Sequence, residues 1–281
     1  MKNKKLQALY GVKWNPFNPD IPLDGLWISP ALEAFLYRVE SLVMDGGYAL
    51  ISGEPGLGKS KSLQLLANRL SGIEDVVVGV MQRPQSSLGD FYREMGDVFG
   101  VKLSPANRYG GFKALRERWR EHIQTTLFRP VLLVDEAQEV ASVCLNEIRL
   151  LGSAHFDSKC LLTTVLCGDT RLPERFRSSS LVSLGSRIRH RLMIQPYDKE
   201  TLKSYLEEVL EKAGGSHLMT AGLINALITH CSGNLRLLNN LAGEVLAEAV
   251  KRDLPQLDEK LFLELYTRQL SPAPKGARRS P

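Results

Sequence analysis

Hydrophobic residues recur along the first two thirds of the chain at two spacings, one typical of helices and one typical of buried strands. Ser29-Pro30 supplies the capping hydroxyl and first-turn proline of a helix, whose apolar positions stop at Gly46-Gly47. Apolar runs of strand length lie at 48–51, 76–80, 131–134 and 161–166. Because these runs alternate with helical segments, the pattern predicts an α/β fold, with a parallel sheet sandwiched by helices.

The pattern changes after about residue 197, where helical periodicity continues and strand-like runs stop. Apolar helix faces are expected at 202–210, 223–228, 235–245 and 261–270. We therefore expect four parts. They are an N-terminal segment at 1–28, an α/β core at 29–197, a C-terminal helical lid subdomain at 198–270 and a disordered basic tail at 271–281.

Composition is that of an ordinary globular protein, since 43% of the 281 residues are hydrophobic and 24% are charged. No apolar run approaches the ~20 residues of a membrane span, and no apolar signal region follows the N-terminal lysines. The four cysteines form no CxxC pair, which fits a reducing compartment. We expect a cytoplasmic protein that has no membrane partner.

The net charge of +5 is concentrated at the ends of the chain. Residues 1–13 and 267–281 hold eight Lys and Arg and no acid, so the rest of the chain carries a net charge of −3. Such tails can bind phosphates, although solvated termini are often charged for solubility alone. Inside the body, basic residues are denser at 108–122 and 171–191.

A phosphate-binding motif follows the first apolar run. Residues 53–60 match GxxxxGK[ST] in full, between a predicted strand and a predicted helix. Glycines let backbone N–H groups turn toward phosphate oxygens, and the helix N-terminus adds partial positive charge. The expected nucleotide-binding residues are Gly53, Glu54, Pro55, Gly56, Leu57, Gly58, Lys59, Ser60 and Lys61. Lys59 would contact the β- and γ-phosphates of ATP, and the Ser60 hydroxyl would bind Mg²⁺.

A pair of acids ends the third apolar run. Asp135 and Glu136 follow 131–134 directly, and in a P-loop protein this is the place of the carboxylates that serve hydrolysis. We expect Asp135 to hold magnesium and Glu136 to polarise the attacking water. Strands commonly end in polar turns, so the pair is informative only together with the phosphate loop.

Three further positions are candidates for sensing or stabilising the γ-phosphate. Asp169 or Thr170 follows the fourth apolar run, where a polar side chain can respond to hydrolysis, although a simple turn is an equal alternative. Arg187, Arg189 and Arg191 stand at alternate positions, and one of these arginines could reach the γ-phosphate of a neighbouring subunit. The same alternation is typical of a half-exposed strand. Arg236 begins a helix of the lid and could reach back to the nucleotide.

Five stretches together resemble the AAA+ ATPases, in particular the branch that contains ExeA-like (GspA) ATPases and TnsC/TniB transposition regulators. The stretches are Tyr10–Phe17, Gly53–Ser60, Asp135–Gln138, Leu166–Leu172 and Gly233–Leu241. They resemble the branch's G-x-x-x-x-P-F opening, phosphate loop, DEAQ or DEAH box, sensor strand and GNPRLLNNL lid helix. The resemblance covers residues ~9–250.

The resemblance implies roles for residues that match these motifs. It implies that Lys59 binds the nucleotide, that Ser60 and Asp135 hold magnesium and that Glu136 is catalytic. The N-terminal segment with Phe17 would contribute to the nucleotide pocket. Arg236 would be sensor 2, and Arg187 would be the trans-acting arginine. Asp169 stands where the family usually has Gln, Asn or Thr, and Thr170 stands where a proline is usual. These two departures leave the sensor 1 residue open.

Three functions follow from the resemblance. The favoured one is a transposition regulator that forms ATP-bound rings or filaments on duplex DNA and recruits or activates a transposase. Because an assembly of that kind must accept any sequence, it would contact backbone phosphates. The candidate contacts are Arg83, Lys102 and Lys113, with Arg108 and Arg116 in the same region. The alternatives are an ExeA-like envelope or secretion ATPase, which typically continues into a membrane span, and a nucleotide-gated scaffold with little turnover.

Overall fold

The structure, a computed structural model, describes residues 2–81, 83, 87–103 and 107–270. The chain separates into two compact units, of which one is Ile28–Gln195 and the other joins Met1–Trp27 to Pro196–Pro281. The expected tail at 271–281 lies outside the described residues. Among the described helices, none combines the length and the apolar character that a membrane crossing requires.

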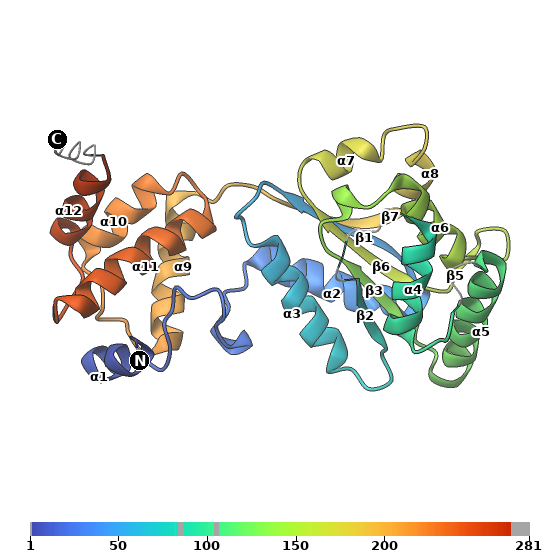
Figure 1. The fold of residues 1–281 in the computed structure, drawn as a ribbon, viewed down its shortest axis with the longest axis horizontal. Coiled ribbons are helices and arrows are strands. Elements are labelled where there is room, and N and C mark those ends of the chain that lie inside the picture. Colours follow the sequence, from blue (N-terminus) through green and yellow to red (C-terminus); the bar gives the residue numbers. More distant parts are fainter. Residues whose placement is uncertain (1, 82, 84–86, 104–106, 271–281) are drawn as a thin grey trace, which may run out of the picture. The chain divides into compact units, whose positions relative to one another are not determined.

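A five-stranded sheet forms the centre of the unit 28–195 (Figure 1). Its strands are all parallel and follow the order β2 (Val78–Met81), β3 (Val131–Val134), β6 (Thr163–Gly168), β1 (Gly47–Gly53) and β7 (Ile188–Ile194). All residues of β1 are buried, as expected for a strand with neighbours on both sides and helices on both faces.

The sequence predicted four of these strands, with shifted ends for three of them. β3 has the expected range, whereas β6 begins and ends two residues later than the apolar run 161–166. Arg189 and Arg191 lie in the half-exposed strand β7, which buries Ile188, Leu192 and Ile194, and Arg187 directly precedes this strand. The fold class is confirmed.

Helices cover both faces of the sheet (Figure 1). On one face lie α2 (Pro30–Asp45) and α3 (Lys59–Ser71), and on the other lie α4 (Leu88–Phe99), α5 (Arg108–Thr126) and α6 (Ser142–Gly152). Shorter elements complete the unit: the 3₁₀ turn η2 (Ala137–Glu139), the antiparallel pair β4 (Ser153–Ala154) and β5 (Lys159–Cys160), and the helices α7 (Arg171–Arg175) and α8 (Val182–Gly185).

The second unit is helical. It contains α9 (Lys199–Ala213), α10 (Ala221–His230), α11 (Leu235–Lys251) and α12 (Glu259–Leu270), and from the N-terminal segment α1 (Lys2–Tyr10) and η1 (Leu23–Gly25). The helix α1 was not predicted, because its sequence is polar with little periodicity. Leu6 and Tyr10 nevertheless pack into the core of this unit, and the Tyr10 hydroxyl donates to the carbonyl of Leu254 at 2.8 Å.

A buried carboxylate joins α4, α5 and α6. Glu147 is only 1% exposed, and it accepts hydrogen bonds from the Tyr92 hydroxyl at 2.5 Å and from Arg108 Nε at 2.9 Å. Burial opposes ionisation of Glu147, but the hydrogen bonds from Arg108 and Tyr92 outweigh it and lower the pKa of the carboxyl. Glu147 is therefore a charged group on which the packing of three helices depends.

Replacing this carboxylate should destabilise the fold. We expect Glu147→Ala to lower the free energy of unfolding by about 2–3 kcal/mol, because the buried Tyr92 hydroxyl loses its partner and a cavity remains. Urea unfolding followed by circular dichroism measures the difference.

Glu121→Ala is the control, since Glu121 is 72% exposed and meets Arg118 only at 3.8 Å; its effect should stay within about 0.5 kcal/mol. The stability that Glu147 contributes is present above the ordinary pKa of a glutamate and is lost as the pH falls through its lowered pKa in the folded state. Equal unfolding midpoints for the two variants would contradict the assignment.

Candidate nucleotide-binding and catalytic site

The phosphate loop connects β1 to α3. Gly56 and Gly58 have φ values of 88° and 98°, which lie in the left-handed region that residues with a Cβ rarely adopt. This backbone lets successive N–H groups face one concave side, and α3 begins directly at Lys59. The loop thus has the local conformation and the helix N-terminus that phosphate binding requires.

Lys59 is buried at the start of α3. Its side chain is 8% exposed. Its ammonium donates one hydrogen bond to a described residue, to the backbone carbonyl of Glu54 at 2.9 Å. Because an ammonium has three donors, this lysine fits a ligand that brings several acceptor oxygens. Ser60 is exposed beside it, whereas the ammonium of Lys61 donates to Gln64 along the surface of α3 at 2.9 Å.

Asp135 and Glu136 stand at the end of β3, next to the end of β6. The Asp135 carboxylate accepts the backbone N–H of Glu136 at 2.9 Å. Burial and the neighbouring Asp135 carboxylate raise the pKa of the Cys167 thiol, while Lys59 acts in the opposite direction. The strand ends therefore bring Asp135, Lys59 and Cys167 into one electrostatic environment.

The oxygen ligands present at this site fit magnesium. No group of three or more His, Cys, Asp or Glu side chains that could hold a metal occurs in the described parts of the chain. Mg²⁺ is commonly held by one or two protein oxygens together with substrate phosphates and water. The Ser60 hydroxyl and the Asp135 carboxylate can supply these oxygens.

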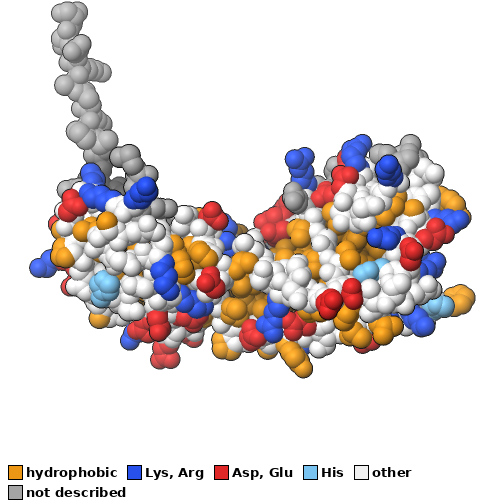
Figure 2. Space-filling view, turned by 90° about the horizontal axis from the view of Figure 1, so that it is seen from below, with side chains coloured by type: hydrophobic (Ala, Val, Ile, Leu, Met, Phe, Trp, Pro, Cys, Tyr) orange, Lys and Arg blue, Asp and Glu red, His pale blue; other side chains and the backbone are white. Residues whose placement is uncertain are grey.

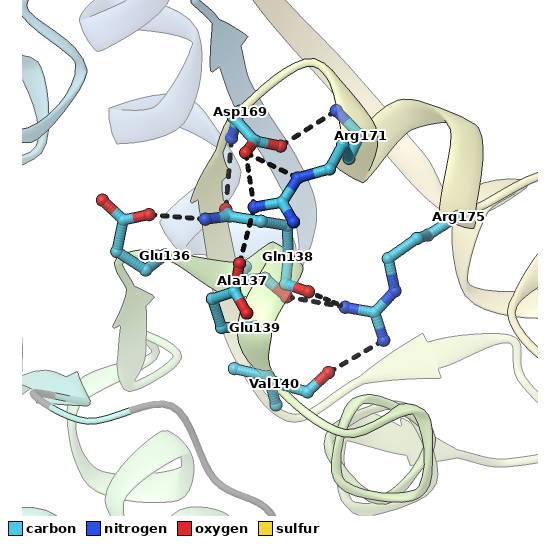
Figure 3. Close-up of polar contacts among 8 residues, drawn as sticks. All are labelled: Glu136, Ala137, Gln138, Glu139, Val140, Asp169, Arg171 and Arg175. Atoms are coloured by element: carbon cyan, nitrogen blue, oxygen red, sulfur yellow. Dashed lines mark hydrogen bonds and ion pairs between the residues drawn. The ribbon is translucent and has the colours of Figure 1, made fainter. Parts of the chain in front are cut away.

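Sequence reasoning missed Gln138 as a site residue. Its side-chain amide lies between Glu136 and the backbone of Asp169 (Figure 3). Glutamine after an Asp-Glu pair carries no chemical signal by itself, and only the adjacency of β3 and β6 shows what it contacts.

Asp169 lies at the end of β6, but its carboxylate is already bound. It accepts from the backbone N–H of Arg171 at 2.9 Å and from Arg171 Nε at 2.8 Å, and Arg171 also pairs with Glu139 at 2.6 Å (Figure 3). The hydrogen bond from Arg171 is the main reason that the pKa of Asp169 is lowered. Thr170 is exposed at the start of α7 and caps nothing with its side chain. The sensor 1 residue stays a prediction.

Arg187 lies at the other end of the sheet from the phosphate loop. It directly precedes β7, whose first residue Ile188 pairs with Tyr48 near the start of β1. The loop follows the last residue of β1, Gly53. Since a strand rises ~3.3 Å per residue, the seven residues of β1 separate the two by about 20 Å, more than an arginine side chain can span.

The guanidinium of Arg187 pairs with Asp157 and donates to the carbonyl of Ser183. With Asp157, Arg149 and Arg189 it lines a cavity of about 470 Å³ at the amino ends of the strands. Arg189 and Arg191 project from the exposed positions of β7. Within the described part of the chain, Arg187 is therefore the one of the three alternating arginines that an ion pair holds.

Phe17 and Arg236 belong to the helical unit. Phe17 is buried in its hydrophobic core beside Gly243 of α11. Arg236 is exposed in the first turn of α11, which Asn234 caps by accepting the N–H of Leu237 at 3.1 Å. Their contact with nucleotide stays a prediction.

Two of the five expected DNA contacts already have partners within the chain. Arg108 binds the buried Glu147, and Arg116 donates to the carbonyls of Leu150, Leu151 and Ser153. These arginines are occupied because α5 packs on α6, and the sequence does not show that packing.

The other three expected contacts, Arg83, Lys102 and Lys113, are exposed. Lys113 pairs with Glu117 of its own helix at 3.8 Å. On the face drawn in Figure 2, outside the grey atoms, Lys and Arg side chains are interspersed with Asp and Glu rather than gathered into a continuous stripe.

The role of Lys59 can be tested directly. We expect Lys59→Ala to abolish ATP binding, because a buried phosphate group would lose its charge-assisted contact. Isothermal titration calorimetry with ATP and Mg²⁺ measures this. Lys203→Ala is the control, since Lys203 is an exposed lysine of α9 that pairs with Glu207, and it should bind within about threefold of the unmodified chain. Unchanged affinity in Lys59→Ala would refute the assignment.

Comparison with known proteins agrees with this geometry. Residues 43–176 match the family model described as AAA domain. The chain is 29% identical over 224 residues to general secretion pathway protein A of Aeromonas hydrophila, an alignment that covers 78% of this chain and 40% of that protein. The chain thus spans less than half the length of this curated relative.

Solved structures share the fold at low sequence identity. The structure of Drosophila ORC bound to DNA has a TM-score of 0.68 at 18% identity, over 95% of this chain and 66% of that one. The Aeropyrum pernix ORC1 protein in complex with DNA has a TM-score of 0.66 at 17% identity, over 90% and 68% of the two chains. Together with the phosphate loop and the acids that follow β3, the match of residues 43–176 to the AAA domain model indicates an ATPase, and the solved structures show that the chain shares their fold.

Proposed function

We propose that this ATPase acts as a regulator of DNA transposition, which assembles with ATP on duplex DNA and recruits or activates a transposase. Assembly into an oligomer is inferred from one observation: Arg187 and the phosphate loop of the same chain are about 20 Å apart. An arginine that serves the γ-phosphate from that position must act on a second copy. The active site would then be complete only in an oligomer.

Within one copy, the roles divide between the ends of two strands, β1 and β3. The loop N–H groups and Lys59 bind the phosphates of ATP, and Ser60 with Asp135 holds Mg²⁺. When bound, the metal supplies positive charge that offsets the charge developing on the phosphate oxygens. Glu136 accepts a proton from the attacking water, and Arg187 of the adjacent copy stabilises the transition state with its planar fork of donors.

Binding to DNA is supported by the resemblance of five motifs to the TnsC/TniB branch. Two structures with the same fold are described as bound to DNA or in complex with DNA. Lys102 and Lys113 are exposed candidates for phosphate contacts, together with Arg83. Since the body of the chain without its basic ends is net negative, binding has to come from such local cations or from the tails.

A second candidate function is that of an ATPase for envelope or secretion assembly. The alignment with general secretion pathway protein A favours it, because it extends over 78% of this chain. Both functions use the same ATP site, so they differ in whether the assembled protein binds DNA.

The trans action of Arg187 can be tested by mixing two inactive variants. Arg187→Ala and Lys59→Ala should each lose most ATPase activity, the first because it lacks the finger and the second because it lacks the loop lysine. In an equal mixture, about a quarter of the interfaces pair an intact loop with an intact arginine, so up to that share of activity should return.

Steady-state phosphate release measures the recovery, and Arg191→Ala with Lys59→Ala is the matched control mixture. Normal turnover by a strictly monomeric Arg187→Ala sample would contradict trans action.

Binding to DNA should depend on ATP and on salt but not on sequence. We expect Lys102→Glu and Lys113→Glu each to weaken binding equally for unrelated duplexes and to reduce the salt slope by about 1 for each lost phosphate contact. Fluorescence anisotropy with ATP at several salt concentrations measures both quantities.

Lys203→Glu reverses a charge in the helical unit, at a lysine that pairs with Glu207, and should leave the affinity unchanged. If the full chain with ATP binds no duplex even at low salt, the transposition function is wrong and the secretion-type ATPase is favoured.

A further inference from the structure

The amide of Gln138 connects two strand ends at the candidate catalytic site. Its Nε2 donates to a carboxylate oxygen of Glu136, and its Oε1 accepts the backbone N–H of Asp169 at 3.1 Å (Figure 3). The side chain is only 8% exposed. Glu136 follows β3 and Asp169 follows β6, so this one amide spans the gap between neighbouring strands.

The direction of the amide is fixed by its two partners. A backbone N–H can only donate, so the group that faces Asp169 is the carbonyl oxygen of the amide. An ionised carboxylate can only accept, so the NH₂ faces Glu136. A reversed amide would lose both bonds, and the bridge therefore holds the Glu136 carboxylate in one orientation.

The turn that carries Gln138 is held against α7. Arg175 donates to the carbonyls of Ala137, Gln138 and Val140, and Arg171 pairs with Glu139 at 2.6 Å (Figure 3). These bonds tie η2 to the segment that directly follows β6. Any displacement of the end of β6 is thus transmitted to Gln138.

Gly168 leaves the space that the amide occupies. A Cβ at this position would lie 2.5 Å from Gln138 Oε1 and 2.8 Å from Leu172 Cδ2. The first contact is with the functional end of the glutamine, so a larger residue would displace the amide from Asp169. The glycine at the end of β6 and the glutamine after β3 are therefore required together.

We propose that Gln138 is a positioning residue, which orients the Glu136 carboxylate and couples it to the end of β6. This inference rests on the role of Glu136 as the base in the proposed function. Glu136 is exposed, and its free side chain would lose part of its population to unproductive rotamers. The bond from the amide removes this freedom and holds the carboxylate in one orientation.

Steady-state ATPase kinetics of the full chain test the coupling. Gln138→Ala should lower kcat by about 10- to 100-fold, the scale of a misplaced catalytic group, and leave KM for ATP within about twofold. Gln138→Glu has nearly the same size and can still accept from Asp169, but it places a carboxylate against Glu136 and should be equally slow. Gln124→Ala, an exposed glutamine of α5, is the matched control and should keep normal turnover.

A double-mutant cycle with Glu136→Gln separates positioning from a general structural effect. If Gln138 acts through Glu136, Gln138→Ala should slow the unmodified chain but leave the Glu136→Gln variant unchanged. The same fold loss in both backgrounds would overturn the proposal, as would normal kcat in Gln138→Glu.

The outcomes also separate this proposal from the role of Glu136. Normal turnover in Glu136→Gln would refute the base assignment and the coupling with it. A slow Glu136→Gln together with a normal Gln138→Ala would overturn the coupling alone. Urea unfolding of each variant shows whether a loss of kcat reflects loss of the folded state.

Discussion

The five strands of the α/β unit run in one direction, and this constraint fixes the place of each candidate catalytic group in that unit. Carboxyl ends of parallel strands meet at one edge of the sheet, so the loop after β1, the acids after β3 and the segment after β6 lie together. The same constraint puts the residue before β7 at the opposite edge. The phosphate-binding groups and Arg187 are thus separated by the length of the sheet.

At the carboxyl edge, the strand ends are joined by side chains as well as by the sheet. β3 and β6 are hydrogen-bonded neighbours up to Val134 and Leu166, and Gln138 extends their connection beyond the last paired residues. Arg175 adds a second connection by donating to the carbonyls of the turn after β3. The site is therefore more firmly held than exposed loops at a sheet edge ordinarily are.

The sequence predicted what depends on contiguous residues. The phosphate loop and Asp135-Glu136 are local motifs, so their positions could be read directly. The end of β6 could not, because the apolar run marks burial and not the hydrogen-bonded ladder that continues through Cys167 and Gly168. Gln138 was missed for the same reason, since its partner Asp169 is 31 residues away.

Two other features that the sequence did not indicate also come from contacts between distant segments. The polar helix α1 shows little periodicity, and it packs through Leu6 and Tyr10 on helices near the other end of the chain. Arg108 and Arg116 were interpreted as phosphate ligands because basic residues cluster around them. Their partners are a buried carboxylate and backbone carbonyls of α6 and β4, which composition cannot indicate.

The ion pair between Arg187 and Asp157 has a consequence for how copies of the chain would recognise each other. In the single chain the guanidinium already has an anionic partner, so a neighbour's phosphates would have to displace a carboxylate. The free energy gained at the interface is then only the difference between the bond of Arg187 to phosphate and its bond to Asp157. The cost of breaking the ion pair is the same for every incoming anion, so it weakens the contact between copies, and any preference for a triphosphate has to come from the charge of the phosphates themselves.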